Sequence, residues 1–364
     1  MTILDRVRGA LTGLSTPLLP DDYTRLLHPL WTRRELRGQI VSVTRQGPDV
    51  ADLVIRRGPG VPADFRPGQH IGIGVRVDGR FVWRSYSLTN APDPVAGTGG
   101  RGLRTRGGTG DGHLRITVKA QHEGRLSRHL VAHAKPGTIV RLAAPAGDFH
   151  LPDPVPEKLL FITAGSGITP VISMLRHLDR RHGPGDGPDV VHLHSVHDDS
   201  GLLFRDELRE LADRRPEYRL IVRRTAEEGR LAAGDVARYV PDLEDRVAYA
   251  CGPGPMLDEL EAAIPGLRTE RFTLDRGSVD AQGGRVTIPG RAEIEVDGAT
   301  TILEAGENAG VQLPYGCRMG ICATCVRQLA DGHARDIRTG ETHGPGERIR
   351  VCVCVPAGDL TLEA

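Results

Sequence analysis

The chain has 364 residues, 26% of them charged, and its 47 Lys and Arg balance its 47 Asp and Glu to a formal net charge of zero. This length exceeds one ordinary hydrophobic core, so we expect two or three domains. The neutral balance argues against nonspecific nucleic-acid binding, which needs a cationic surface, and no apolar run approaches the roughly 20 residues that cross a bilayer. The charged opening lacks the apolar core of a secretion signal, which predicts a cytoplasmic protein.

The predicted elements begin with an amphipathic helical segment over residues 1–35. Ile3, Leu4, Val7 and Leu11 recur at helical spacing, and prolines end the pattern further on. We expect this helix to pack on the body of the protein. A role at a membrane surface is the alternative, although the segment is not markedly basic.

Residues 36–152 carry short β-type runs separated by Gly and Pro, a pattern typical of an antiparallel barrel. Half of the residues from Gly97 to Gly112 are glycine. Such a segment cannot bury apolar area, which predicts a mobile loop. The runs predicted to be strands are Gln39–Val43, Ala51–Ile55, His70–Val75, Leu114–Val118 and Ile139–Leu142.

Residues 153–272 change to strands that alternate with helices, which predicts a parallel, doubly wound α/β sheet. The first strand, Lys158–Thr163, leads into a Gly-rich turn and a helix that reaches His177. Further strands are predicted at Val190–Ser195, Tyr218–Arg223 and Arg246–Ala250, and further helices at Phe204–Ala212 and Met256–Ile264.

The C-terminal part, residues 290–364, is predicted to follow a tether. Residues 273–289 are short of large apolar side chains and contain Gly-Gly, a composition typical of a linker. After it, strands are expected at Glu293–Val296, Thr301–Leu303 and Val326–Leu329 around a Cys-rich loop.

The cysteines carry the strongest motif. Cys317, Cys322 and Cys325 have the spacing of a plant-type 2Fe–2S loop, and a fourth cysteine lies near the C-terminus. Structural zinc is the alternative, but it usually draws on two C-x2-C knuckles, and only Cys322 with Cys325 forms one. The fourth ligand is Cys352 or Cys354. Both lie on one face of a predicted strand, so strand parity does not choose between them.

A second motif, Arg84-Ser85-Tyr86-Ser87, closes a predicted barrel strand. A Tyr can stack on a flat flavin ring, a Ser hydroxyl can hydrogen-bond its reactive nitrogen, and an Arg can hold a phosphate. Downstream, Lys119 and the turn from Gly124 to Ser127 offer backbone and hydroxyl donors for a pyrophosphate.

With these motifs in this order, residues 36–364 resemble the ferredoxin–NADP reductase superfamily, in the subgroup with a C-terminal plant-type ferredoxin domain. The resemblance implies three domains: an FAD-binding antiparallel β-barrel over 36–152, an α/β doubly wound nicotinamide domain over 153–272, and an α+β β-grasp ferredoxin domain over 290–364. The implied cofactors are FAD, a 2Fe–2S cluster, and NADPH or NADH as the donor.

The resemblance also implies roles for single residues. Arg84, Tyr86 and Ser87 would hold FAD, with the Lys119 and Gly124–Ser127 region at its pyrophosphate. In the ferredoxin tail the ligand precedes a Pro by four positions, which favours Cys352 over Cys354. The residues that match the family's nicotinamide-nucleotide loops are Gly165, Gly167, Thr169, Pro170, Cys251, Gly252 and Pro253.

Three residues are implied to be catalytic: Ser87, Cys251 and Glu270. Cys251 would place a thiol beside the nicotinamide ring, and a buried core cysteine is the alternative. Glu270 would relay a proton toward Ser87, and a solvated surface acid is the alternative.

The identity of the donor depends on charges near two predicted strand ends. Where many relatives have Arg-Thr after the second strand of this domain, the chain reads Val196-His197-Asp198-Asp199, and two acids nearby would repel a 2′-phosphate and favour NADH. In the next loop Arg223, Arg224 and Arg230 would supply the positive charge that NADPH needs. We expect NADPH.

Nicotinamide gives two electrons as a hydride, whereas the cluster holds one electron, and a flavin converts one form into the other. We therefore predict an NAD(P)H-dependent oxidoreductase that reduces a separate desaturase or oxygenase. Residues 21–23, 28–31 and 83–87 are similar to NADPH-dependent reductases that serve membrane acyl-CoA desaturases. That similarity favours a fatty acyl, membrane-bound acceptor, which would hold this protein at the membrane periphery. The alternatives are a reductase of a ring-hydroxylating or alkane oxygenase, and a redox sensor without turnover.

Overall fold

The computed structural model describes residues 28–32, 36–62, 64–77, 80–92, 112–121, 124–272, 283–298, 300–315, 320, 323–337 and 339–363. Residues 1–27 of the predicted N-terminal helical segment, residues 97–111 of the Gly-rich loop, and Cys317 and Cys322 lie outside these residues. The chain divides into two compact units. The larger comprises Met1–Val82 and Tyr86–Glu270, and the smaller comprises Trp83–Ser85 and Arg271–Ala364.

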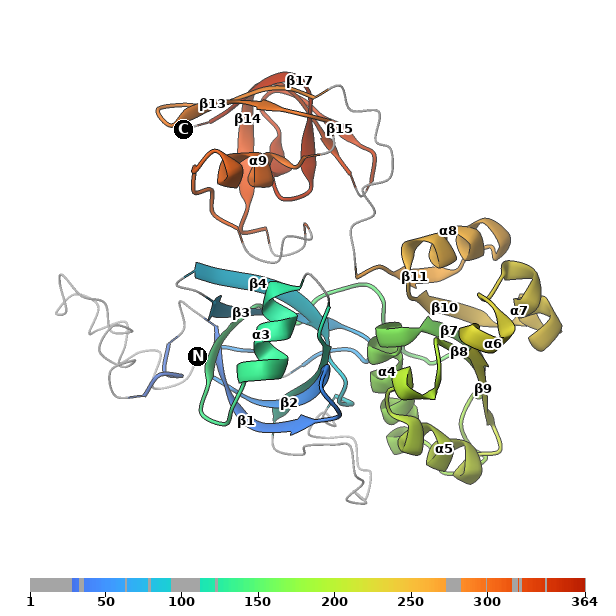
Figure 1. The fold of residues 1–364 in the computed structure, drawn as a ribbon. Helices are drawn as coiled ribbons and strands as arrows, with labels where there is room; N and C mark the ends of the chain where they lie inside the picture. The colour runs from blue at the N-terminus through green and yellow to red at the C-terminus, as the bar shows by residue number, and fades with distance from the viewer. Residues whose placement is uncertain are drawn as a thin grey trace. The chain divides into compact units, whose positions relative to one another are not determined.

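Six antiparallel strands form the nearly closed barrel that the sequence predicts. Ala51, Leu53 and Ile55 of one strand are fully buried and alternate with residues that face outwards. The order is β4-β3-β6-β1-β2-β5, and an antiparallel bridge between Leu88 and Ile116 joins its two ends. The elements are β1 Arg37–Arg45, β2 Val50–Arg57, β3 His70–Val77, β4 Arg80–Ser87, β5 His113–Lys119, α3 Arg125–His133 and β6 Ile139–Leu142 (Figure 1).

A parallel sheet of order β11-β10-β7-β8-β9 forms the second half of the larger unit. Helices α4 and α5 pack on one face, and α7 and α8 pack on the other, so the central strands are apolar on both faces. The strands are β7 Lys158–Ala164, β8 Asp189–Val196, β9 Tyr218–Arg224, β10 Val247–Cys251 and β11 Arg268–Glu270. The helices are η1 Gly165–Gly167, α4 Ile168–Arg181, η2 Asp199–Gly201, α5 Arg205–Arg214, α6 Thr225–Glu228, α7 Ala233–Tyr239, η3 Leu243–Asp245 and α8 Gly254–Ala263 (Figure 1).

Helix α4 connects the sheet with the barrel. Ser173 Oγ, Arg176 Nη1 and Arg180 Nη1 donate hydrogen bonds to backbone carbonyls of residues 89–92, at 2.5 to 2.9 Å. These residues directly follow the end of β4. The helix therefore fixes the exit of a barrel strand against the nucleotide-type sheet.

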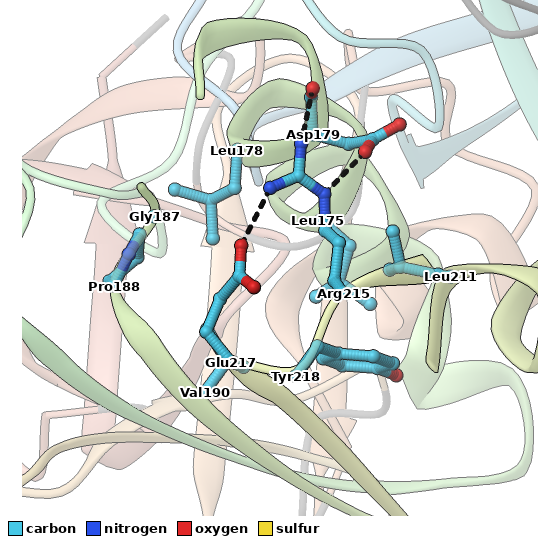
Figure 2. A pocket seen from close by; sticks show the side chains of 10 residues that line it. All are labelled: Leu175, Leu178, Asp179, Gly187, Pro188, Val190, Leu211, Arg215, Glu217 and Tyr218. Atoms are coloured by element: carbon cyan, nitrogen blue, oxygen red, sulfur yellow. Dashed lines mark hydrogen bonds and ion pairs between the residues drawn. The ribbon is translucent and has the colours of Figure 1, made fainter. Parts of the chain in front are cut away.

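Arg215, between α5 and β9, holds the far end of α4. Its Nε lies 2.5 Å from Asp179 Oδ1 and its Nη1 lies 2.8 Å from Glu217 Oε1 (Figure 2). The guanidinium also donates to the backbone carbonyls of Asp179, His182 and Gly183. Its side chain is 7% exposed, and these bonds use the donors of the planar fork. The charge is buried but fully hydrogen-bonded.

The smaller unit is a mixed sheet that packs against α9. The order is β13-β12-β17-β14-β15, with β16 paired to β14, and β12 runs parallel to β17. The elements are β12 Gly284–Ile288, β13 Ala292–Val296, α9 Ile302–Asn308, β14 Val326–Asp336, β15 Thr342–His343, β16 Arg348–Arg350 and β17 Cys354–Leu362 (Figure 1).

Three sequence-based expectations for this unit are wrong. Thr301–Leu303 is the start of helix α9, because Thr301 Oγ1 accepts from Glu304 N at 3.3 Å and Thr301 N donates to Glu304 Oε2 at 3.4 Å. Strand β12 lies inside the predicted tether, where Val286 and Ile288 alternate into the core. Cys352 lies in a turn, and β17 begins only at Cys354. The two cysteines therefore do not share a strand.

Candidate functional site

The strand order predicts a ligand crevice at the C-terminal ends of β7 and β10, which form the switch point of this sheet. From β7, the chain continues to β8 and β9 on one side, whereas β10 and β11 lie on the other side. Doubly wound sheets bind ligands in the crevice at such a switch point. The two predicted nucleotide loops form its rims, Gly165–Gly167 after β7 and Cys251–Pro253 after β10.

Glycines let the two rims approach through their backbones. A Cβ at Gly167 would clash with the carbonyl of Cys251, and one at Gly252 would lie 3.1 Å from Ala164 Cβ. Gly165 has a φ of 53°, in the left-handed region that favours glycine. A side chain at Gly167 would therefore force the rims apart.

Helix α4 begins directly after the first rim. Thr169 Oγ1 donates to Ser166 O at 2.9 Å, which closes the first turn, and Thr169 and Pro170 are both buried. The start of α4 thus lies at the crevice, where backbone N–H groups at a helix start favour an anion.

Cys251 ends β10 and is fully buried. Its register partners are Thr163 on β7 and Glu270 on β11. Burial, and second the Glu270 carboxylate, raise the pKa of the Cys251 thiol well above its usual value. The Cys251 side chain is therefore an uncharged thiol at neutral pH. It packs in the apolar core of the sheet, directly before the loop Gly252–Pro253.

Glu270 has a partner that sequence reasoning missed. His70 Nδ1, on barrel strand β3, lies 3.3 Å from Glu270 Oε1, on β11. Burial raises the pKa of the Glu270 carboxyl, and His70 partly offsets this rise. The two residues are 200 positions apart, so no local pattern joins them. The alternative for Glu270, a solvated surface acid, is wrong, because its side chain is 13% exposed.

On the barrel side, β4 carries the residues of the second motif. Tyr86 packs partly buried against the barrel core, Ser87 is buried and Arg84 is exposed. Ser87 Oγ and Thr89 Oγ1 are buried without a hydrogen-bond partner among the described residues. Because buried hydroxyls are normally paired, the end of β4 fits a polar ligand such as a flavin ring.

The turn before α3 is closed by its own side chain. Ser127 Oγ accepts from Gln121 N and donates to Gly124 O, both at 3.1 Å, and a Cβ at Gly124 would clash with that hydroxyl. Lys119 ends the neighbouring strand β5 and is half-buried. The Ser127 hydroxyl is thus already used within the protein.

The predicted charges beside the crevice lie at the ends of β8 and β9. Arg224 Nε lies 2.9 Å from Asp199 Oδ1, and the two side chains are 33% and 48% exposed. Arg223 is buried and donates to the backbone carbonyls of residues 228 and 229. Arg230 is exposed. Arg224 and Arg230 therefore remain accessible, whereas Arg223 is part of the fold.

A buried polar network connects the neighbouring strands β7, β8 and β9. Thr163 Oγ1 is 2.8 Å from His192 Nε2 and 2.7 Å from His194 Nδ1, and His192 Nδ1 is 2.9 Å from Tyr218 Oη. Burial lowers the pKa of His194 to about 4, and a hydrogen bond to Thr163 partly opposes this shift. Burial, and second the nearby His194, lower the pKa of His192 well below its usual value. Both rings are neutral at physiological pH.

These two histidines predict an acid-sensitive fold. Because the folded pKa of His194 lies below the unfolded value of 6.5, its contribution is present above pH 6.5 and is lost as pH falls toward 4. Over that range it should cost about 3 kcal/mol of unfolding free energy. In urea unfolding at several pH values, His194→Gln should flatten this slope. A slope in His194→Gln equal to that of the wild type would contradict the assignment.

Two of the predicted cluster ligands lie among the described residues, and they converge. Cys325 Sγ and Cys352 Sγ are 3.1 Å apart, and both side chains are buried. Cys354 is buried as well, but it pairs with Asp336 of β14 in the sheet ladder. Adjacent buried thiols suit the thiolate ligands of an iron–sulfur cluster, so the site fits that group.

A barrel, a doubly wound sheet and a converged thiol pair define the class of pyridine-nucleotide-dependent electron-transfer proteins. Residues 286–357 match the model of the 2Fe-2S iron-sulfur cluster binding domain, and residues 161–261 match that of the oxidoreductase NAD-binding domain. The chain is similar to phthalate dioxygenase reductase, with a TM-score of 0.59 at 22% identity over 91% of this chain and 98% of that chain.

Two relatives are similar over most of their length. An NADPH oxidoreductase of Mycobacterium tuberculosis is 49% identical over 98% of this chain and 92% of the relative. A stachydrine N-demethylase reductase subunit of Rhizobium meliloti is 28% identical over 83% of this chain and 88% of the relative. The chain therefore belongs to the family of ferredoxin reductase-type NAD(P)H oxidoreductases with a 2Fe–2S ferredoxin domain.

Membership in this family confirms the predicted enzyme class and the cofactor set of FAD, a 2Fe–2S cluster and NAD(P)H. In the part of the chain that the structure describes, no helix has the length and apolarity needed to cross a membrane. The residue assignments and the domain boundaries stay predictions.

Proposed function

We propose that this protein takes a hydride from NADPH and passes its two electrons singly, through the 2Fe–2S cluster, to a separate desaturase or oxygenase. The observation that carries this proposal is the buried Cys325–Cys352 pair in a chain that also holds a nucleotide crevice. A one-electron carrier and a two-electron donor site thus belong to one polypeptide. Bound FAD supplies the conversion between hydride and single electrons.

The end of β4 is proposed to hold FAD, with Tyr86 against the ring, Ser87 at its polar edge and Arg84 at a phosphate. The buried, unpaired hydroxyl of Ser87 supports this assignment. The Ser127 hydroxyl closes its own turn. We therefore expect the backbone N–H groups at the start of α3, with Lys119 nearby, to meet the pyrophosphate.

The crevice is proposed to hold the nicotinamide nucleotide. The rim from Gly165 through Thr169 and Pro170 would bind its phosphates at the start of α4, and Cys251–Pro253 would position the ring. The close approach of Gly167 to the backbone of Cys251 supports a shared pocket, because it brings the two loops side by side. As a neutral thiol, Cys251 orients the ring without adding a charge.

The proposed cluster ligands are Cys317, Cys322, Cys325 and Cys352. Support for Cys352 comes from its 3.1 Å approach to Cys325. The proposed domains are a barrel over 36–152 and a nicotinamide domain over 153–272, as in the sequence analysis, and a ferredoxin domain that begins with β12 at Gly284 instead of at residue 290, because β12 pairs with β13 and β17.

NADPH is the proposed donor, and Arg224 with Arg230 is proposed to meet its 2′-phosphate. The name of the Mycobacterium relative supports NADPH. Arg224 is bound to Asp199 in the structure, but both are exposed, so a phosphate can compete for the guanidinium.

Replacing Arg224 should change the donor preference. Because a hydrogen bond between charged groups contributes about 1.5–3 kcal/mol, Arg224→Ala should lower kcat/KM for NADPH about tenfold or more and leave that for NADH within about twofold. Arg219→Ala, on the same strand but bonded to Tyr239 O, should change neither. Steady-state rates with both donors measure this, and an equal loss for both donors would contradict the role.

The terminal acceptor has two candidates. The similarity of residues 28–31 and 83–87 to desaturase-serving reductases favours a fatty acyl desaturase, which would hold this protein at the membrane periphery. The name of the Rhizobium relative, a reductase subunit of a demethylase, favours an oxygenase.

The test is an anaerobic titration of the holoenzyme with NADPH and then NADH, followed by visible absorption and EPR. We expect flavin bleaching and the EPR signal of a reduced 2Fe–2S cluster. Reconstitution with a membrane desaturase and with a ring-hydroxylating oxygenase then separates the acceptors. Protein that contains zinc instead of iron and sulfide, or that shows no flavin absorption, would overturn the proposal. Slow reduction by NAD(P)H without repeated turnover would instead favour a redox sensor.

A further inference from the structure

A hollow on the barrel gathers three arginines from three neighbouring strands. Its volume is about 290 Å³, and the described residues that line it are Arg37 of β1, Arg76 of β3, and Ile139 and Arg141 of β6. All four are half-buried or exposed, and none of them is acidic. Arg76 lies six residues along β3 from His70, about 20 Å away, and His70 is the residue that meets the parallel sheet. The hollow is therefore separate from the nucleotide crevice.

Strand pairing brings these cations onto one face. Arg37 and Arg141 are direct partners in the antiparallel pair of β1 and β6, and Arg141 is the partner of Gly74 in the pair of β3 and β6. Arg76 follows Gly74 by two positions, so it faces the same side. The residues on either side of Arg141 are buried in the barrel core. The shared face of the three arginines is therefore the outer face of the barrel.

The charges of the hollow favour an anion. Like charges that stand directly opposite each other destabilise an antiparallel sheet, and arginine stays protonated at physiological pH. Gly74 adds no side chain to fill the space between Arg76 and Arg141. The whole chain has a formal net charge of zero, so this concentration of cations is local. An anion that the three guanidinium groups share would offset their repulsion.

The shape of the guanidinium group selects the kind of anion. Each group presents a planar fork of N–H donors that matches two oxygens of a phosphate. Arg37 Nη1 also donates to Pro29 O at 3.3 Å, which holds one fork in place. A volume of about 290 Å³ lies at the lower end for ligand sites. It fits a phosphate that carries a small organic group and excludes a dinucleotide.

We propose that the hollow binds the phosphate group of a small phosphorylated molecule or of a phospholipid headgroup. Both ligands present the same chemistry to Arg37, Arg76 and Arg141. Charge and hydrogen bonds hold the ligand, and no covalent bond forms or breaks. The site goes beyond the proposed function, because neither hydride nor electrons pass through it.

The neighbouring segment, residues 28–32, distinguishes the two sources of phosphate. Leu30 and Thr32 are buried, whereas the side chain of Trp31 is 49% exposed. The Arg37 contact with Pro29 O connects this segment with the hollow. Tryptophan is enriched where proteins meet the headgroups of a membrane. Trp31 should therefore contribute to binding of a headgroup in a bilayer and leave binding of a soluble phosphate unchanged.

Calorimetric titration of the holoenzyme with glycerol 3-phosphate and with inorganic phosphate tests the site. Saturating NADP⁺ and constant ionic strength keep the nucleotide crevice occupied and nonspecific screening equal. Arg141→Gln should weaken binding about tenfold, and Arg141→Lys should weaken it less, because lysine keeps the charge but not the fork. The matched control is Arg238→Gln, which removes an arginine that is 67% exposed on α7, and it should bind as wild type does.

Cosedimentation with vesicles separates the two sources. A headgroup site predicts binding to phosphatidylglycerol vesicles but not to zwitterionic phosphatidylcholine vesicles, and this binding should be weaker in both Arg141→Gln and Trp31→Ser. A soluble ligand predicts binding of glycerol 3-phosphate that Trp31→Ser leaves unchanged, without vesicle binding. If neither phosphate nor vesicles bind, or if Arg141→Gln binds as tightly as Arg238→Gln, the site is overturned. Flavin bleaching by NADPH should be at the wild-type rate in Arg141→Gln, so the proposed function is tested separately.

Discussion

Cys352→Ser should yield a protein that still accepts a hydride from NADPH but no longer passes electrons on. Cys352 Sγ lies 3.1 Å from Cys325 Sγ, so its loss would leave the cluster one thiolate short. We expect acceptor reduction to fall about a hundredfold, with loss of the cluster's EPR signal. Flavin bleaching by NADPH should stay near the wild-type rate, because the substitution lies in the smaller unit.

Cys354→Ser is the matched control. It is the same substitution two positions away, in a residue that the sheet ladder pairs with Asp336. Iron and sulfide content and the EPR signal should remain at wild-type levels. If the cluster were lost from Cys354→Ser and kept in Cys352→Ser, the ligand assignment would be reversed.

Arg215→Met should be the most destabilising of the substitutions considered. Methionine keeps the stem that packs among the apolar side chains of Figure 2, but it leaves Glu217 without its cation and Asp179 with only the half-exposed Arg214. Their side chains are 17% and 12% exposed, and removal of one partner from a buried ion pair costs about 3–5 kcal/mol. Denaturant unfolding of the holoenzyme should show a loss of about 3 kcal/mol.

Arg214→Met tests whether burial is the cause. Arg214 also contacts Asp179, at 3.1 Å, but its side chain is 44% exposed. Exposed ion pairs contribute about 0–1 kcal/mol, so this variant should remain close to wild type. Similar losses for the two variants would show that the Arg215 contacts are not what stabilises this region.

Both folds of the larger unit could be predicted from the sequence, because their periodicity is local. Runs such as Ala51–Ile55 alternate between core and solvent, and Lys158–Thr163 is apolar on both faces between turn residues. The Gly-rich turn after β7 could be predicted in the same way, because Gly165 and Gly167 follow a strand and precede a helix. Each of these signals lies within a dozen residues.

What the sequence could not show depends on contacts between distant segments. His70 meets Glu270 across 200 positions. Cys352 lies in the turn between β16 and β17, which both pair with β14. Cys352 and Cys354 therefore do not share a strand, as the sequence pattern had suggested. The start of α9 is different, because Thr301 and Glu304 have the spacing of a capping box, and attention to that pair would have identified the helix.

Helix α4 begins at the rim of the crevice, is bonded along its length to residues 89–92, and ends under Arg215. One straight element thus spans the nucleotide loop and the exit of the strand that carries Tyr86 and Ser87. Asp199 and Arg224 lie outside this frame, at the ends of other strands. We therefore expect donor preference to depend on side chains that can be exchanged at the surface, whereas the distance between the nucleotide loop and the end of β4 depends on a buried helix.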